Sequence, residues 1–249
     1  MVDHQTRYKM QQLRLFGMLE ALENLSNQSV NQDISFGEGM RLCLDAESNY
    51  RDTKRLNRLM KTAKIRYQAA SIESINTEHK RDIPENDWRW LINGNWITQH
   101  QNIIFNGPAG IGKTYLACAC ANLACRKGIN TRYFRLTRLL DELRMAHADG
   151  SYSKLLTSLL KAKCLIIDDW GIPNISQERR ADLLEIIDDS YEERSVIIAT
   201  QLPVNLWHEY IGDNTIADAI LDRVIHQAKI FTLKGDSMRK KLHHLDHYA

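Results

Sequence analysis

Short apolar runs alternate with longer amphipathic stretches from about residue 100 onward. Five runs have the length and composition of buried strands, at 102–106, 131–135, 163–168, 195–200 and 229–233. With helices between them, they predict a parallel sheet covered by helices on both faces, which places a nucleotide at the carboxyl ends of the strands. Two helices, 137–146 and 152–162, are expected between the second and third strands. About sixteen residues follow the last predicted strand, too few for a separate helical lid.

The first 80 residues follow a helical pattern and contain no proline. One helix is expected from about residue 13, a second over 36–49, and a third in which apolar residues recur at i, i+3, i+4, i+7 and i+11 between Leu56 and Tyr67. The composition changes at 82–100, where three tryptophans favour a packed connector, with contact to a nucleotide base as the alternative. We therefore expect a small all-helical domain at 1–82 and an α/β domain at 83–249.

The third predicted helix has a strongly basic surface. Its segment contains one acid, Asp52, against seven bases: Arg51, Lys54, Arg55, Arg58, Lys61, Lys64 and Arg66. Such a face is either simply solvated or contacts the phosphates of a nucleic acid, and the imbalance favours phosphate contact.

Overall charge is nearly balanced, with 33 basic and 31 acidic residues among 249, so nucleic-acid binding would need local patches of this kind. No secretory signal or membrane-spanning run is evident, which predicts a cytoplasmic protein without membrane contact. The five cysteines lack a paired CxxC spacing, and this favours buried thiols over a zinc site. Three histidines near the C-terminus, at 243, 244 and 247, favour a frayed end over metal binding.

The strongest motif follows the first strand. It consists of Gly107, Pro108, Ala109, Gly110, Ile111, Gly112, Lys113 and Thr114, and Tyr115 opens the next helix. The spacing GxxxxGKT between a strand and a helix is typical of a phosphate-binding loop, in which backbone N–H groups surround the phosphates. Lys113 would contact the β- and γ-phosphates of ATP, and the Thr114 hydroxyl would bind Mg²⁺.

Two acids end the third predicted strand. Asp168 is expected to hold the metal through a coordinated water, and Asp169 to orient or deprotonate the attacking water. The alternative is a pair of acids that cap a turn before Gly171.

Three further polar residues are candidates for sensing and triggering hydrolysis. Gln201 follows the fourth strand, where it would sense the γ-phosphate or simply end the strand. Arg223 lies on a helix predicted at 215–227, where it would reach a neighbouring subunit's nucleotide or form a salt bridge with Asp222. Arg239, beyond the last strand, would fold back onto the phosphates or belong to a solvated tail.

Five motifs together resemble a known family. GPAGIGKTYLACACA, CLIIDDWG, VIIATQLPVNLW, AILDRVIH and LKGDSMRKK occur in this order, and they are similar to the IstB-type ATP-binding helpers of insertion-sequence transposition and to their relatives, the DnaC-type helicase loaders. The resemblance extends over essentially the whole chain. It implies an AAA+ P-loop NTPase fold.

The resemblance also implies roles for individual residues. The nucleotide contacts would run from Gly107 through Tyr115, with Arg223 as an arginine finger and Gln201 and Arg239 as sensors. It adds candidate DNA contacts inside a spiral of subunits, namely Arg135, Arg138, Arg144 and Lys154. Asp169 stands where many AAA+ enzymes have Glu, and Gln201 where Asn is commoner, which is consistent with slow hydrolysis.

These observations predict an ATPase that oligomerises on double-stranded DNA with ATP and recruits or stimulates a transposase, with hydrolysis driving disassembly. A helicase loader is the nearest alternative, with the same ATPase domain and a different partner for the N-terminal domain. A metabolic kinase would need an acceptor site, which the sequence does not offer. A nucleotide-gated adaptor without turnover would assemble with ATP whether or not Asp169 is present.

Overall fold

The computed structural model describes residues 2–28, 34–75, 83–235 and 237–238. The chain divides into two compact units between Arg58 and Leu59. We call them the N-terminal unit and the sheet unit. The sequence pattern predicts a domain boundary at 82, and the compact sheet unit begins at residue 59.

Helices form the N-terminal unit, with α1 at His4–Gln12, α2 at Phe16–Gln28 and the start of α3, which spans Phe36–Ala63. Asp3 caps α1 by accepting the Thr6 N–H at 2.9 Å. The expectation of separate helices at 36–49 and near 56–67 was wrong, because α3 is continuous and ends at Ala63. No glycine or proline interrupts it between these segments, and the helix stops where Lys64 adopts a left-handed φ of 53°.

Five parallel strands form the sheet of the second unit, in the order β2-β3-β4-β1-β5. Their bounds are Asn102–Asn106 (β1), Thr131–Arg135 (β2), Cys164–Trp170 (β3), Ser195–Thr200 (β4) and Ala228–Thr232 (β5). Nearly every residue of β1, β3 and β4 is buried, as expected for strands covered on both faces. The predicted five-stranded parallel sheet is confirmed.

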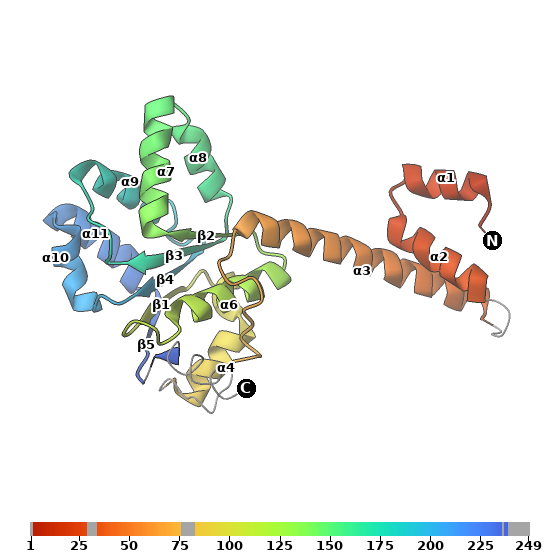
Figure 1. Cartoon of the computed structure of the whole chain (residues 1–249), viewed down its shortest axis with the longest axis horizontal. Helices are drawn as coiled ribbons and strands as arrows, with labels where there is room; N and C mark the ends of the chain where they lie inside the picture. Colours follow the sequence, from red (N-terminus) through yellow and green to blue (C-terminus); the bar gives the residue numbers. More distant parts are fainter. Residues whose placement is uncertain (1, 29–33, 76–82, 236, 239–249) are drawn as a thin grey trace, which may run out of the picture. The chain divides into compact units, whose positions relative to one another are not determined.

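Helices cover both faces of this sheet (Figure 1). One face carries α6 (Lys113–Arg126), with α4 (Glu85–Asn93) beside it, and the short helix α5 (Asn95–Thr98) follows α4 in the chain. The opposite face packs on a core shared with α7 (Leu136–Asp149), α8 (Tyr152–Leu160), α9 (Gln177–Asp188), α10 (Trp207–Ile211) and α11 (Asn214–Ile225). A 3-10 turn at Val204–Leu206 precedes α10. The two helices predicted between the second and third strands are α7 and α8. In the described part of the chain, no helix is long and apolar enough to cross a membrane.

The connector tryptophans and the cysteines are largely core residues. Trp96 is fully buried and donates its indole N–H to the Leu91 carbonyl at 3.1 Å, and Trp88 is 8% exposed. All five cysteines are free and buried. Burial raises the pKa of the Cys118 thiol to about 11, so these side chains behave as small apolar groups.

The segment at 64–75, which follows α3, is held along α6. The Asn122 side-chain amide donates to the carbonyls of Gln68, at 3.0 Å, and Ala70, at 2.5 Å. Arg126 makes two contacts of 2.9 Å to the Glu73 carboxylate. These contacts explain why the sheet unit includes residues that precede the connector.

Candidate nucleotide-binding site

The phosphate loop joins β1 to α6 at the carboxyl edge of the sheet. Its backbone takes positive φ at Gly107, Gly110 and Gly112, and the N-terminus of the 14-residue helix α6 begins at Lys113. A Cβ at Gly110 would collide with the Ser237 hydroxyl, so only glycine fits there. Met238 N–H donates to the Gly110 carbonyl at 3.0 Å, which joins the segment after β5 to the loop.

Lys113 is 8% exposed, and its ammonium group lies inside the loop. It donates to the carbonyls of Gly107 and Pro108 at 2.7 Å each. The positive charge is thus already held at the centre of the loop, close to the backbone N–H groups at the start of α6. Such a loop at a helix N-terminus is suited to bind an anion.

Asp168 and Asp169 lie in a β-bulge of β3. Ile167 pairs with Ile198 of β4 and Trp170 with Thr200, so two residues of β3 face one of β4. Because of this extra residue, Trp170 returns to the same core as Leu165 and Ile167 although the alternation would place it on the other face. Both acids lie near the carboxyl end of β3, and they line the same cavity as the phosphate loop.

Asp168 is almost fully buried, at 1% exposure, and it contacts two hydroxyl groups. Its Oδ1 accepts from the Thr114 hydroxyl at 3.0 Å, and its Oδ2 accepts from the Tyr133 hydroxyl of β2 at 2.7 Å. Burial raises the pKa of Asp168, and the adjacent Asp169 charge adds to the rise, whereas the hydrogen bonds from Tyr133 and Thr114 oppose it.

Asp169 has a left-handed backbone, with φ of 61°. A non-glycine residue in this region stores strain and is often found at functional sites. Its Oδ2 lies 3.5 Å from Nε of Arg135, at the end of β2. Arg135, which the family resemblance suggested as a DNA contact, thus lies beside an acid of the site.

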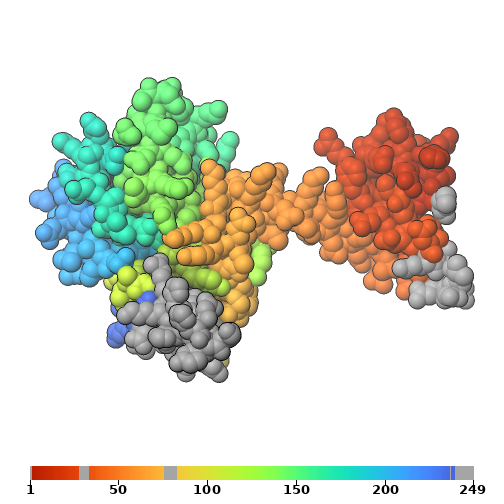
Figure 2. Space-filling model, viewed as in Figure 1, coloured from red at the N-terminus to blue at the C-terminus, as the bar shows by residue number. Residues whose placement is uncertain are grey.

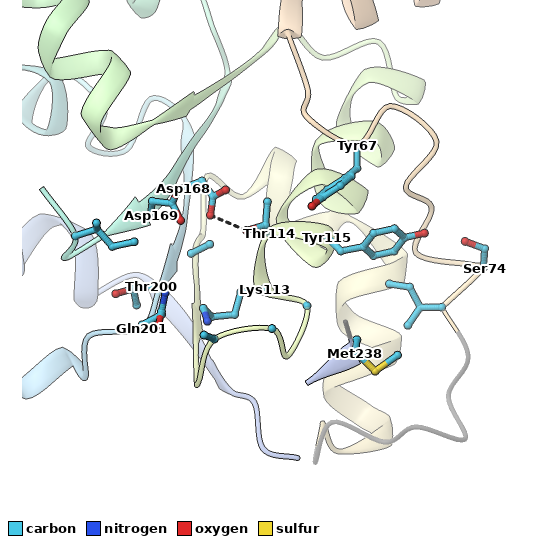
Figure 3. Close-up of a pocket in the computed structure, with 16 residues that line it drawn as sticks. Tyr67, Ser74, Lys113, Thr114, Tyr115, Asp168, Asp169, Thr200, Gln201 and Met238 are labelled. Atoms are coloured by element: carbon cyan, nitrogen blue, oxygen red, sulfur yellow. Dashed lines mark hydrogen bonds between the residues drawn. The ribbon is translucent and has the colours of Figure 1, made fainter. Parts of the chain in front are cut away.

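These residues line one cavity of about 500 Å³ (Figure 3). Lys113, Thr114, Asp168 and Asp169 form its polar end, with Thr200 and Gln201 from the end of β4 next to them. Tyr67, Ser74, Tyr115 and Met238 line the part that extends away from the acids, and Ile75 also belongs to the lining. The Tyr67 and Tyr115 ring centroids are 6.0 Å apart. The volume and the division into polar and aromatic parts fit a nucleoside triphosphate.

The donor set also fits Mg²⁺. The Thr114 hydroxyl and the Asp168 carboxylate are hydrogen-bonded to each other and lie next to Lys113. Mg²⁺ takes hard oxygen ligands, commonly one or two protein groups together with substrate phosphates and water.

Arg223 lies at the opposite end of β1 from the phosphate loop. At the start of β1, the Asn102 amide donates to the backbone carbonyl of Arg223 at 3.2 Å. The Arg223 guanidinium pairs with Asp188 at the end of α9. The local partner that the sequence suggested, Asp222, pairs instead with His226 at 3.2 Å. Arg223 is therefore remote from the cavity of its own chain. Arg239 and the three C-terminal histidines lie outside the described residues.

The remaining basic candidates lie on two helical surfaces. Arg51, Lys54, Arg55, Arg58 and Lys61 are all exposed along one side of α3, at spacings of three and four residues. Arg138 and Arg144 on α7 and Lys154 on α8 are exposed in the sheet unit, where α7 and α8 (green) lie at the surface in Figure 2. These two groups are separate from the nucleotide cavity.

Several residues of the cavity were not predicted. Tyr67 continues the apolar spacing of α3 and was assigned to that helix, although the chain leaves the helix before it. Ser74, Ile75 and Ile172 carry no sequence signal for this site. The Tyr133 contact depends on β2 lying beside β3, and no motif specifies that pairing.

The phosphate loop, the acidic bulge and the strand order define a P-loop domain of the AAA+ class. The chain belongs to the family described as IstB-like ATP binding protein, whose model matches residues 8–245.

Similar proteins include the insertion sequence ATP-binding protein y4pL of Sinorhizobium fredii (strain NBRC 101917 / NGR234), 39% identical over 96% of this chain and 98% of that protein. The insertion sequence IS1162 ATP-binding protein of Pseudomonas fluorescens is 43% identical over 82% of this chain and 88% of that protein. Among solved structures, the DnaC helicase loader aligns with a TM-score of 0.54 and 20% identity over 68% of this chain and 99% of that one. That similarity concerns the fold alone.

Proposed function

We propose that this protein is an Mg²⁺-dependent ATPase that assembles on double-stranded DNA when ATP is bound and recruits or stimulates a transposase. ATP hydrolysis then releases the assembly. The observation that carries the proposal is the meeting of Lys113, Thr114, Asp168 and Asp169 around one cavity, in a chain whose relatives are named as insertion-sequence ATP-binding proteins.

Each residue has a separate task in this proposal. Lys113 and the N–H groups of the loop neutralise the phosphates, and the Tyr67 and Tyr115 rings cover the base. Thr114 and Asp168 hold Mg²⁺, which supplies further positive charge to the phosphate oxygens. Asp169 orients the attacking water or accepts its proton, and Gln201 contacts the γ-phosphate. Phosphoryl transfer depends mainly on such positioning and charge neutralisation.

Arg223 acts on the nucleotide of a neighbouring subunit. Arg223 lies at the start of β1, whereas the cavity of the same chain lies beyond the end of β1, and this separation supports the assignment. ATP at the joint between two subunits would bind the assembled state in preference to the single subunit, and nucleotide would therefore set assembly. The basic residues of α3, and those of α7 and α8, would hold the DNA.

The transposase role is favoured over helicase loading because the curated relatives are named for insertion sequences, whereas the similarity to DnaC concerns the fold. Pull-down with a transposase and with a replicative helicase would separate the two partners. Capture of the helicase alone would reject the transposase role.

Mixed-subunit ATPase assays test the site and the joint together. Lys113→Ala is expected to abolish ATP-dependent assembly on DNA, and Asp169→Asn to preserve assembly and stop turnover. Neither Lys113→Ala nor Arg223→Ala should hydrolyse ATP alone, but their mixture should recover part of the activity, since hybrid joints combine an intact loop with an intact arginine.

Asp188→Ala is the matched control, because it breaks the same ion pair while leaving the arginine in place. It should retain hydrolysis. Equal loss in Asp188→Ala and Arg223→Ala, with no recovery on mixing, would assign Arg223 to a structural salt bridge.

A further inference from the structure

A buried tyrosine of β2 contacts the acid that is proposed to hold the metal. Tyr133 is 8% exposed, and its hydroxyl donates to Asp168 Oδ2 at 2.7 Å. Tyr133 pairs in register with Ile166, and Asp168 lies two residues farther along β3. An aromatic side chain is long enough to reach such a diagonal neighbour. The contact is therefore fixed by the sheet itself.

The two hydroxyl contacts of Asp168 differ in their place relative to the cavity. Thr114 bonds Oδ1 and lines the cavity, and its hydroxyl oxygen is also expected to bind Mg²⁺ through a lone pair. Tyr133 bonds Oδ2 from β2, on the side of β3 away from β4, and is not part of the cavity lining. Its contact with Asp168 can persist throughout the cycle.

We propose that Tyr133 is a positioning residue for Mg²⁺: it fixes the orientation of the Asp168 carboxylate so that Oδ1 stays beside the Thr114 hydroxyl, and these two groups would together hold the metal. This inference rests on the proposed ATPase function. Loss of the hydroxyl would leave a buried carboxylate oxygen without its donor and free the carboxylate to rotate. The effect falls on the metal and not on the phosphate loop, because Tyr133 is not a loop contact.

Tyr133→Phe tests the inference, since it removes one oxygen and keeps the ring. Binding of AMP-PNP, a non-hydrolysable ATP analogue, is measured by calorimetry in EDTA and over a series of Mg²⁺ concentrations. We expect wild-type affinity in EDTA and about a tenfold rise in the Mg²⁺ concentration needed for half of the metal-dependent gain in affinity, as for loss of a hydrogen bond to a charged group. The matched control is Tyr152→Phe, which removes a hydroxyl bonded to Glu185 between α8 and α9. It should leave the Mg²⁺ requirement unchanged.

Two results would overturn the inference. One is an unchanged Mg²⁺ requirement in Tyr133→Phe. The other is a loss of AMP-PNP affinity in Tyr133→Phe that is as large in EDTA as in Mg²⁺. If the variant is less stable by thermal unfolding, a double-mutant cycle with Asp168→Asn decides. Tyr133→Phe should raise the Mg²⁺ requirement no further in the Asp168→Asn background, whereas additive effects would reject the contact as the cause. Failure of the proposed function looks different, because the wild-type protein itself would then not bind AMP-PNP.

Discussion

Gly17 lies where α2 crosses α3, and the crossing leaves no space for a side chain. A Cβ at this position would lie 2.6 Å from the Ala46 carbonyl oxygen and 2.6 Å from the Tyr50 Cβ. Gly37, in the same N-terminal unit, has nothing within 4 Å of the corresponding position. The two glycines thus separate the effect of packing from the effect of helix propensity.

Gly17→Ala is expected to lower the free energy of unfolding of the N-terminal unit by about 1–3 kcal/mol, because α2 and α3 must move apart. Gly37→Ala should leave it unchanged or raise it by up to about 1 kcal/mol, since alanine favours a helix. All five tryptophans lie in the sheet unit. Urea unfolding followed by far-UV circular dichroism reports both units, and tryptophan fluorescence reports the sheet unit alone. A Gly17→Ala transition equal to that of Gly37→Ala would contradict the packing argument.

At the scale of elements, the bulge in β3 determines where the acids lie. Without one residue between Ile167 and Trp170, the pairing with β4 would be regular: Asp168 would face Ala199, and the tryptophan would still face Thr200. Of the two acids, only Asp169 has the strained, left-handed backbone. We therefore take Asp169 to be the extra residue of the bulge, which strand pairing does not require.

Deletion of Asp169 should therefore leave a cooperatively folding sheet unit that binds AMP-PNP and does not hydrolyse ATP. Deletion of Ile166 is the control, because it removes a paired residue and moves Asp168 to the other face. Thermal unfolding and calorimetry distinguish the two. If the variant lacking Asp169 is as unstable as the one lacking Ile166, the bulge is a required part of the sheet.

The strands were predictable from the sequence because each is a short run rich in apolar, aromatic or β-branched residues, and their observed ends lie within two residues of the predicted ones. The phosphate loop was equally predictable, since its glycines and Lys113 are adjacent in the chain. The continuity of α3 was not, because its apolar pattern weakens near Asn49 and suggests two helices. Contacts that depend on strand order, such as those of Tyr133 and Arg135 with the two acids, carry no local signal.

At the scale of the whole molecule, the net charge of +2 is too small to attract DNA, so any affinity depends on how the charges are distributed. The basic candidates of α3 and those of α7 and α8 are exposed, but α7 also carries Asp141, Glu142 and Asp149. The proposed function does not require that the two groups contribute equally.

Salt dependence of DNA binding measures each contribution. The double variant Arg58→Gln and Lys61→Gln on α3 should reduce the slope of log K against log salt by about 1.8 if both residues contact phosphates. Arg138→Gln with Arg144→Gln tests α7 in the same way and has the same change in charge. Fluorescence anisotropy with a duplex in the presence of AMP-PNP gives both slopes. A surface whose variant keeps the wild-type slope does not contact the DNA.

The position of Asn102 has a consequence for how subunits would add to an assembly. β1 runs from Asn102 to Asn106, five residues or roughly 16 Å. The phosphate loop and the cavity follow its last residue, and the last turn of α11 is hydrogen-bonded to its first residue. If Arg223 completes a neighbour's cavity, each copy contributes unlike ends to its two joints, and a row of copies has a head and a tail. Unless the row closes on itself, one terminal copy holds ATP that no arginine reaches. That copy would hydrolyse its ATP most slowly and would be the last subunit to dissociate from the DNA.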